Sequence, residues 1–157
     1  MGLNLKAIDL KKYPSVKKDL FKLMKNIWSK KESYENAIHS IERWHKNNES
    51  GIYFFINQDK NRIGITGYWP IKGSEGSYGL RHHGTTIKGT GKLSLGLLIE
   101  EIKKREDKFT QLIELIPKGR EELIAKFEKW GFKLDPKGVP EWEPKKDYYE
   151  YAMVRIL

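Results

Sequence analysis

Gly89 and Gly91 interrupt the chain between two segments of regular patterning. Before them, Tyr78–His83 alternates as a strand does; after them, Lys92–Arg105 carries leucine and isoleucine at helical spacing. Such a turn lets another group approach its backbone closely, because glycine has no side chain to block the approach. The pattern predicts a protein that combines a sheet with helices and places an exposed turn at the start of one helix.

Length and composition favour one compact domain. The chain has 157 residues, which suits a single domain over residues 1–157. Charged residues make up 32% and apolar residues 38%, but the 12% of aromatic residues supplies bulky side chains for a core. We therefore expect a folded domain and not a disordered chain.

The first half of the chain predicts a strand, two helices and a hairpin. Leu3–Ile8 reads as the strand, and Val16–Trp28 as the first helix. Ser33 is a candidate cap for the second helix. Two further strands, Gly51–Ile56 and Arg62–Trp69, are separated by turn-forming residues and are expected to pair as an antiparallel hairpin.

The second half continues with strands and helices in alternation. After the strand at Tyr78–His83 and the helix that follows it, Phe109–Ile116 reads as a strongly apolar strand. Glu121–Trp130 predicts a helix that Gly131 ends. Two more strands close the chain, one from Phe132 and one over Tyr148–Ile156. The order predicts a mixed α/β (α+β) fold.

The chain is basic, with a formal net charge of +9 and a pI near 9.5. Its lysines are scattered, which favours a solvated surface over a nucleic-acid-binding stripe, although the charge alone leaves a nucleic-acid partner open. An anionic cofactor is a third explanation. We expect a nucleic-acid partner to be the less favoured of these.

The sequence contains no cysteine, which excludes disulfides, thiolate catalysis and cysteine-ligated metals. The first ten residues lack the apolar core of a signal peptide, and no apolar run has the length of a membrane helix. His39 and His45 lack the spacing and the carboxylate companion of a shared metal site. We expect a cytoplasmic protein with no metal and no membrane partner.

The glycine turn is a candidate anion site. Several backbone N–H groups point the same way at a helix start, where the helix also carries a partial positive charge. Lys88 and Lys92 would add positive charge. Taken alone, the same residues also suit a tight turn that binds nothing.

Two motifs resemble the GNAT superfamily of N-acetyltransferases. Thr86–Gly91 resembles that family's pyrophosphate loop, usually Q/R-x-x-G-x-G/A, and it likewise follows a strand and opens a helix. Phe127–Phe132 is similar to the Tyr-Glu-Lys-x-Gly-Phe segment that ends the family's last helix. The distance between the motifs and the order of elements match the family as well.

The resemblance implies a mostly antiparallel sheet that splays open, with acetyl-CoA in the split. It implies that an amine attacks the thioester directly, so the partners are acetyl-CoA and a primary-amine acceptor, and a homodimer would be in keeping with the family. The implied cofactor-binding residues lie on the strand and in the turn: Leu80, Arg81, His82, Thr86, Ile87, Lys88, Gly89, Thr90, Gly91 and Lys92.

Three residues depart from the family pattern. Thr86 replaces the usual Gln or Arg, which weakens one phosphate contact. Phe127 occupies the position of a tyrosine acid, and a phenyl ring has no proton to donate. Arg120 stands about where an asparagine often touches the cofactor. The departures affect catalysis more than cofactor binding.

Three residues are candidate general bases. His82 and His83 lie beside the implied thioester position and titrate near neutrality, but either histidine would equally suit packing or a solvent-facing position. Glu114 lies in an apolar strand, where burial would raise its pKa; it would equally suit the wetter face of the sheet.

Weaker candidates occur elsewhere. Glu75 sits in the loop before the strand that carries the histidines, and solvated glutamate is the more ordinary reading. The closing strand holds tyrosines that could replace the missing acid but more often serve packing: Tyr148, Tyr149 and Tyr151. Three aromatic residues could line an acceptor pocket or belong to the core: Tyr68, Trp69 and Trp142.

Three hypotheses follow. The first is an acetyl-CoA-dependent N-acetyltransferase acting on a primary amine. The second is a GNAT-like module that binds coenzyme A without turnover, as Phe127 would suggest. The third is a basic nucleic-acid-associated domain, which would bind with a steep dependence on salt.

Overall fold

The computed structural model describes residues 2–157. Its strands are β1 (Leu3–Ala7), β2 (Ile52–Gln58), β3 (Asn61–Pro70), β4 (Ser77–Thr85), β5 (Gln111–Pro117), β6 (Lys133–Leu134) and β7 (Tyr149–Ile156). Its α-helices are α1 (Tyr13–Ile27), α2 (Lys31–Asn47), α3 (Gly91–Arg105) and α4 (Glu122–Lys129), with a 3-10 turn, η1, at Lys146–Tyr148. The strands hydrogen-bond in the order β1-β2-β3-β4-β5-β7-β6.

The residues form two compact units. One contains the chain up to Trp69 together with Arg81–Arg105, and the other contains Pro70–Leu80 and Glu106–Leu157. Strand β4 begins in the second unit and ends in the first. Each unit has its own strands and helices, and each is described by itself below.

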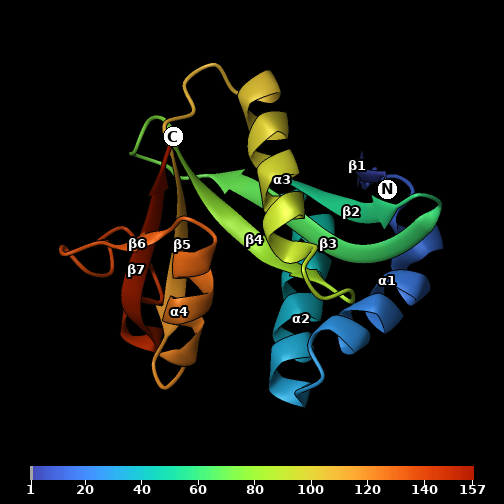
Figure 1. Ribbon diagram of the computed structural model, residues 1–157, viewed down its shortest axis with the longest axis horizontal. Helices are drawn as coiled ribbons and strands as arrows, with labels where there is room; N and C mark the ends of the chain where they lie inside the picture. The colour runs from blue at the N-terminus through green and yellow to red at the C-terminus, as the bar shows by residue number, and fades with distance from the viewer. Residues whose placement is uncertain (1) are drawn as a thin grey trace. The chain divides into compact units, whose positions relative to one another are not determined.

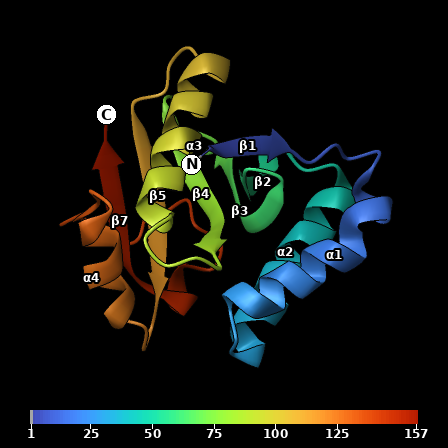
Figure 2. The same cartoon turned by 45° about the vertical axis from the view of Figure 1, so that its right-hand side comes forward.

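In the first unit, β1, β2 and β3 form an antiparallel sheet, with Leu5 opposite Ile56 and Phe55 opposite Ile65. Helices α1 and α2 run beside each other in both views (Figures 1 and 2). They bury one face of this sheet in an aromatic and aliphatic core: Tyr13, Leu20, Met24, Ala37, Ile41, Trp44, Tyr53, Phe55 and Ile65. Apolar residues at helical spacing on two helices and alternate residues on two strands supply this core.

Helix α3 covers the opposite face of the same strands. The guanidinium of Arg105 lies 5.4 Å from the centre of the Phe54 ring, which stacks on Tyr68 at 6.5 Å. Phe54 alternates with the core residues Tyr53 and Phe55, so β2 is covered on both faces. This explains why Tyr53–Ile56 of β2 is apolar at every position instead of alternating with polar residues.

In the second unit, the start of β4 pairs in parallel with β5, from Ser77–Gln111 to Gly79–Ile113. Strand β7 is antiparallel to β5 on one side and to β6 on the other. Helix α4 lies alongside β5 and β7 in both views (Figures 1 and 2). Gly131 follows α4 with φ +92°, and the amide of Phe132 returns to the carbonyl of Phe127 at 3.0 Å. Gly131 therefore ends α4 as the sequence predicts.

The expected order of strands and helices is confirmed, and so is the mixed α/β fold with a mostly antiparallel seven-stranded sheet. The cap predicted at Ser33 is wrong. Helix α2 begins at Lys31, and its N-cap residue Lys30 makes no side-chain capping bond. Ser33 lies within the first turn of the helix, where it cannot cap.

Among the helices of the described chain, none has both the length and the apolar character needed to cross a membrane.

Candidate functional site

The turn between β4 and α3 is held by its threonines. The Thr90 hydroxyl donates to the carbonyl of Ile87 at 2.6 Å and lies 2.8 Å from the Thr85 hydroxyl, while the Thr86 amide donates to the carbonyl of Ile63 at 2.7 Å. Gly89 adopts φ +87°, a conformation that side chains disfavour. The loop is therefore organised by its own contacts.

The outer surface of this turn presents amides without partners. Helix α3 begins at Gly91, and its first internal contact is the Ser94 amide to the Thr90 carbonyl at 2.9 Å. Among the described residues, the amides of Ile87, Lys88, Gly89 and Lys92 have no acceptor in the chain. The first turn of α3 carries no acidic residue, and a Cβ on Gly89 would meet nothing within 4 Å. Free amides, a helix N-terminus and adjoining lysines make a site suited to phosphate oxygens.

His83 connects β4 to the start of α3. Its Nδ1 lies 2.8 Å from the Thr66 hydroxyl, and its Nε2 lies 2.8 Å from the carbonyl of Gly91. The carbonyl can only accept, so Nε2 carries the proton and Nδ1 accepts from Thr66. With 6% of its surface exposed, His83 fits the packing interpretation better than that of a free base.

We expect His83→Ala to lower the free energy of unfolding by about 2 kcal/mol, because it removes two hydrogen bonds and leaves the buried Thr66 hydroxyl without a partner. Urea unfolding of the purified variant measures this. His39→Ala, at an exposed position on α2, is the matched control and should change stability little. Equal effects of the two substitutions would contradict the connecting role of His83.

Arg81 and His82 both point toward the side of the sheet that α2 covers. The Arg81 guanidinium lies 5.1 Å from the centre of the Tyr53 ring, and its Nη2 donates to the carbonyl of Ser50 at 3.0 Å. The His82 Nε2 lies 3.0 Å from the Ser40 hydroxyl. The strand alternation predicted over Tyr78–His83 would place Arg81 and His82 on opposite faces of β4, and that expectation is wrong at Arg81. The pairing of β4 with β5 ends at Gly79, so the pleat is not constrained on that edge.

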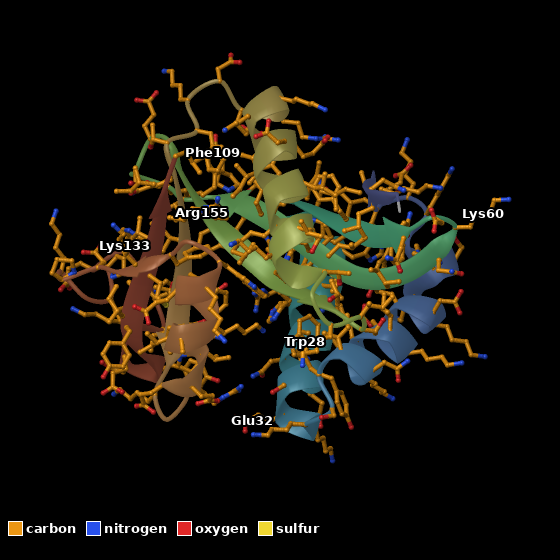
Figure 3. The ribbon with its side chains drawn as sticks, in the orientation of Figure 1. Trp28, Glu32, Lys60, Phe109, Lys133 and Arg155 are labelled. Atoms are coloured by element: carbon orange, nitrogen blue, oxygen red, sulfur yellow. The ribbon has the colours of Figure 1, made fainter. Side chains whose placement is uncertain are left out.

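His82 is packed against the end of α1. Its ring lies 5.8 Å from that of Trp28, edge to face, and Figure 3 marks Trp28 where α1 ends. A Cβ on Gly84 would meet Ile27 at 2.5 Å, so the strand here fits closely against the helix. Desolvation, then the charges of Arg81 and Arg43, lower the pKa of His82 to about 4. His82 is neutral at physiological pH.

Glu114 belongs to the second unit, on β5 opposite Met153 of β7. Desolvation raises its pKa to about 8, against the opposing effect of the Lys126 ammonium and a backbone hydrogen bond. Lys126 on α4 extends over the Trp130 ring, 4.8 Å from its centre, and desolvation lowers its pKa in turn. Of the two interpretations offered by the sequence, the raised pKa agrees with a carboxyl that is partly buried in the strand.

Glu114 should make the protein less stable as the pH rises. Its pKa is about 8 in the folded state and near 4.5 in an ordinary environment, so between these values the folded state holds the extra proton. Stability is lost across that interval, and Glu114→Gln should unfold at higher urea than the parent protein at pH 9, by on the order of a few kcal/mol. At pH 5 the difference should nearly vanish. The exposed Glu128→Gln should show no such trend.

The remaining candidates have ordinary surroundings. Glu75 is exposed and forms an ion pair with Lys108, and Arg120 pairs with Glu122. Phe127 is buried between Trp130 and Phe132, at ring distances of 5.4 and 5.5 Å. No three metal-ligating side chains gather anywhere in residues 2–157.

Sequence reasoning missed the residues that surround the histidines. Thr66, Ser40 and Trp28 come from other parts of the chain, and for Ser40 and Trp28 nothing in the local pattern marks them as neighbours of β4. The proximity of Lys126 to Glu114 also required the packed structure. A polar residue in the apolar run Ile63–Tyr68 was the one available signal, and it pointed to Thr66.

Solved structures that are similar to this chain include several acetyltransferases. A GNAT-family acetyltransferase from Staphylococcus aureus Mu50 matches with a TM-score of 0.68 at 17% identity, covering 99% of each chain. The PaiA N-acetyltransferase from Thermoplasma acidophilum, in complex with coenzyme A, matches with a TM-score of 0.62 at 14% identity, covering 100% of each. AAC(6')-Ib in complex with ribostamycin and coenzyme A matches with a TM-score of 0.69 at 16% identity, covering 99% of this chain and 94% of that one.

No protein-family model matches the chain, and a search of curated proteins finds no match. The low identities to the solved structures show a shared fold. The chain thus has the GNAT fold, and the resemblance read from its two motifs is confirmed at that level.

Proposed function

We propose that the protein is an acetyl-CoA-dependent N-acetyltransferase, acting as a single domain over residues 1–157. The observation that carries the proposal is the glycine turn before α3, with its unpartnered amides, in a chain that has the GNAT fold. Two of the similar structures are complexes with coenzyme A. The extent of these matches supports treating the whole chain as one functional domain.

The turn would hold the pyrophosphate of acetyl-CoA. The amides of Ile87 to Lys92 would donate to its oxygens, and the exposed ammonium groups of Lys88 and Lys92 would balance its charge. Gly89 allows close approach because its Cβ position is open. Thr86 adds only a short hydroxyl, already 3.2 Å from the Ile63 carbonyl, so the lysines take a larger share of the anion's charge than in proteins with the usual residue.

The reaction would be direct transfer. A neutral primary amine attacks the thioester carbonyl; the N–C bond forms, the C–S bond breaks, and one amine proton passes to a base. Near neutrality a thiol of ordinary pKa, about 8.5, leaves readily as the thiolate. A dedicated acid is therefore dispensable, which accommodates the phenyl ring of Phe127.

Glu114 and His82 remain the candidate bases, and their pKa values separate them. A base with pKa about 8 requires deprotonation near the working pH, whereas a histidine with pKa about 4 is already neutral. With either base, turnover rises with pH as the acceptor amine loses its proton. Turnover by Glu114 would show an additional rise through about pH 8, which turnover by His82 would lack. His83 would have to give up both of its hydrogen bonds to serve.

The proposal is tested by titrating the protein with acetyl-CoA while following thermal unfolding. A ligand at 100 times its Kd stabilises a native state by about 2.7 kcal/mol, which is readily seen. Release of free coenzyme A thiol with a panel of primary amines then tests catalysis. No stabilisation at millimolar acetyl-CoA would sink the proposal. Stabilisation without thiol release from any amine would favour a binding module instead.

A further inference from the structure

Arg81 is a buried cation with an unused donor. Its side chain is 9% exposed, and its Nε, also buried, has no hydrogen-bond partner among the described residues. The other two guanidinium nitrogens have partners. Nη2 donates to the Ser50 carbonyl at 3.0 Å, and Nη1 lies 3.5 Å from the Tyr53 hydroxyl. A buried N–H without a partner costs free energy, so a native protein that keeps one offers a place for an acceptor atom.

The charges around Arg81 leave a positive excess. Glu49 is shared by two arginines: its Oε2 lies 3.1 Å from the Arg43 Nε, and its Oε1 lies 3.8 Å from the Arg81 Nη2. His82, the next residue on β4, is neutral because desolvation lowers its pKa, and the two guanidinium groups add to that effect. One carboxylate thus faces two cations, and the balance is one positive charge.

The edge of α2 beside these residues is polar, and its nearest carboxylate on the same face is that of Glu32 in the first turn of the helix. Asn36, Ser40, Arg43 and Asn47 follow one another at spacings of four, three and four, so they share one face of the helix. Ser40 contacts His82, and the other three are exposed. A polycationic amine would find no negative partner among these four residues, whereas an anion would find the Arg43 guanidinium.

We propose that the acceptor of this acetyltransferase is a small amine that also carries a carboxylate, as an amino acid does, and that Arg81 and Arg43 bind that carboxylate. The inference rests on the proposed function. The carboxylate supplies the acceptor that the Arg81 Nε lacks and neutralises the excess charge of the Arg81–Glu49–Arg43 cluster. The site selects against polyamines through the same excess charge.

Matched pairs of acceptors test this. Each amino acid is compared with the amine left by removing its carboxylate: lysine with cadaverine, ornithine with putrescine, and phenylalanine with phenethylamine. We expect kcat/KM for the better amino acids to exceed that of their decarboxylated partners about tenfold or more. Equal or faster turnover of the decarboxylated amines would overturn the assignment.

Variants of the cluster test which residues cause the preference for an amino acid over its decarboxylated amine. Arg43→Gln should raise KM for the amino acid about tenfold while leaving the decarboxylated amine unaffected, so the preference shrinks. Arg81→Lys should also shrink the preference, measured as the ratio of the two kcat/KM values within that variant. Glu49→Gln removes the carboxylate that faces the two arginines, so it should increase the preference for the amino acid. Arg62→Gln is the matched control, because Arg62 is also an arginine of the first unit but lies over Phe55, 4.2 Å from its ring centre. An unchanged preference in both Arg43→Gln and Arg81→Lys would refute the roles given to these residues.

The failure of this inference can be told from the failure of the proposed function. Stabilisation by acetyl-CoA alone reports the cofactor site, and the folded Arg43→Gln, Glu49→Gln and Arg62→Gln variants should retain it. Should no acceptor be turned over, saturation-transfer NMR with the same pairs, in the presence of coenzyme A, measures binding directly. Stronger or equal signals from the decarboxylated amines would then overturn the charge preference, whatever becomes of catalysis.

Discussion

Replacing Trp44 with alanine is expected to lower the free energy of unfolding by about 3–5 kcal/mol, the largest effect of any single truncation in the first unit. Trp44 is 1% exposed and packs edge to face on Tyr53, at 5.1 Å between ring centres, and on Tyr13 at 6.4 Å. Its indole N–H donates to the carbonyl of Gly51 at 3.3 Å. The substitution therefore opens a cavity between α2 and β2 and removes a buried hydrogen bond.

Urea unfolding followed by circular dichroism measures this loss. Trp142→Ala is the matched control, because the same atoms are removed from a side chain that is 36% exposed, and we expect it to cost about 1 kcal/mol or less. A loss of that small size at Trp44 would mean that α2 does not depend on this residue for its packing. Since a typical domain has about 5–15 kcal/mol in total, the Trp44 variant should also show a markedly lower Tm.

Gly89→Trp is expected to abolish the stabilisation that acetyl-CoA gives to the parent protein. The Cβ at this position points into open space, so the indole need not disturb the core, but it would cover the amides of the turn. The positive φ of 87° adds a strain of about 1 kcal/mol for any residue with a side chain. We expect the protein to remain folded and its apparent Kd for acetyl-CoA to rise at least about a hundredfold.

Gly138→Trp provides a control for that strain. Gly138 also has a positive φ, 73°, and also has nothing within 4 Å of its Cβ position, but it lies in the loop after β6. It should cost similar stability and leave acetyl-CoA binding intact. Full stabilisation of the Gly89 variant by acetyl-CoA would show that the pyrophosphate is bound elsewhere and would withdraw the central support for the proposed function.

Local patterns were sufficient where local forces decide the structure. Gly131 ends α4 because only the positive φ of a glycine-like residue closes the helix in this way, and that requirement is visible in the sequence. Helix α3 could likewise be predicted from its apolar spacing, and the turn before it from its glycines. The cap at Ser33 failed because α2 starts two residues earlier without any side-chain cap, its stability coming from packing through Ala37, Ile41 and Trp44.

Only part of the candidate site could be predicted from the sequence. Gly89 and its neighbours could be found from sequence because an anion-binding turn is a continuous segment. The surroundings of His82 and Arg81 could not, since Trp28, Ser40 and Glu49 reach them from positions 32 to 54 residues away in the chain. Alternation along β4 predicted the wrong face for Arg81, which lies beyond Gly79, where the pairing of β4 with β5 ends.

The sequence by itself determined the elements, their order and the glycine turn before α3, because helical spacing, strand alternation and positive-φ positions are properties of short segments. Only the tertiary structure decided what each ionisable group does. Burial and neighbouring charges hold His82 neutral and raise the pKa of Glu114 to about 8, and close packing gives His83 two hydrogen bonds within the fold. Desolvation and Coulomb interactions depend on distances between segments, and those distances exist only once the chain has folded.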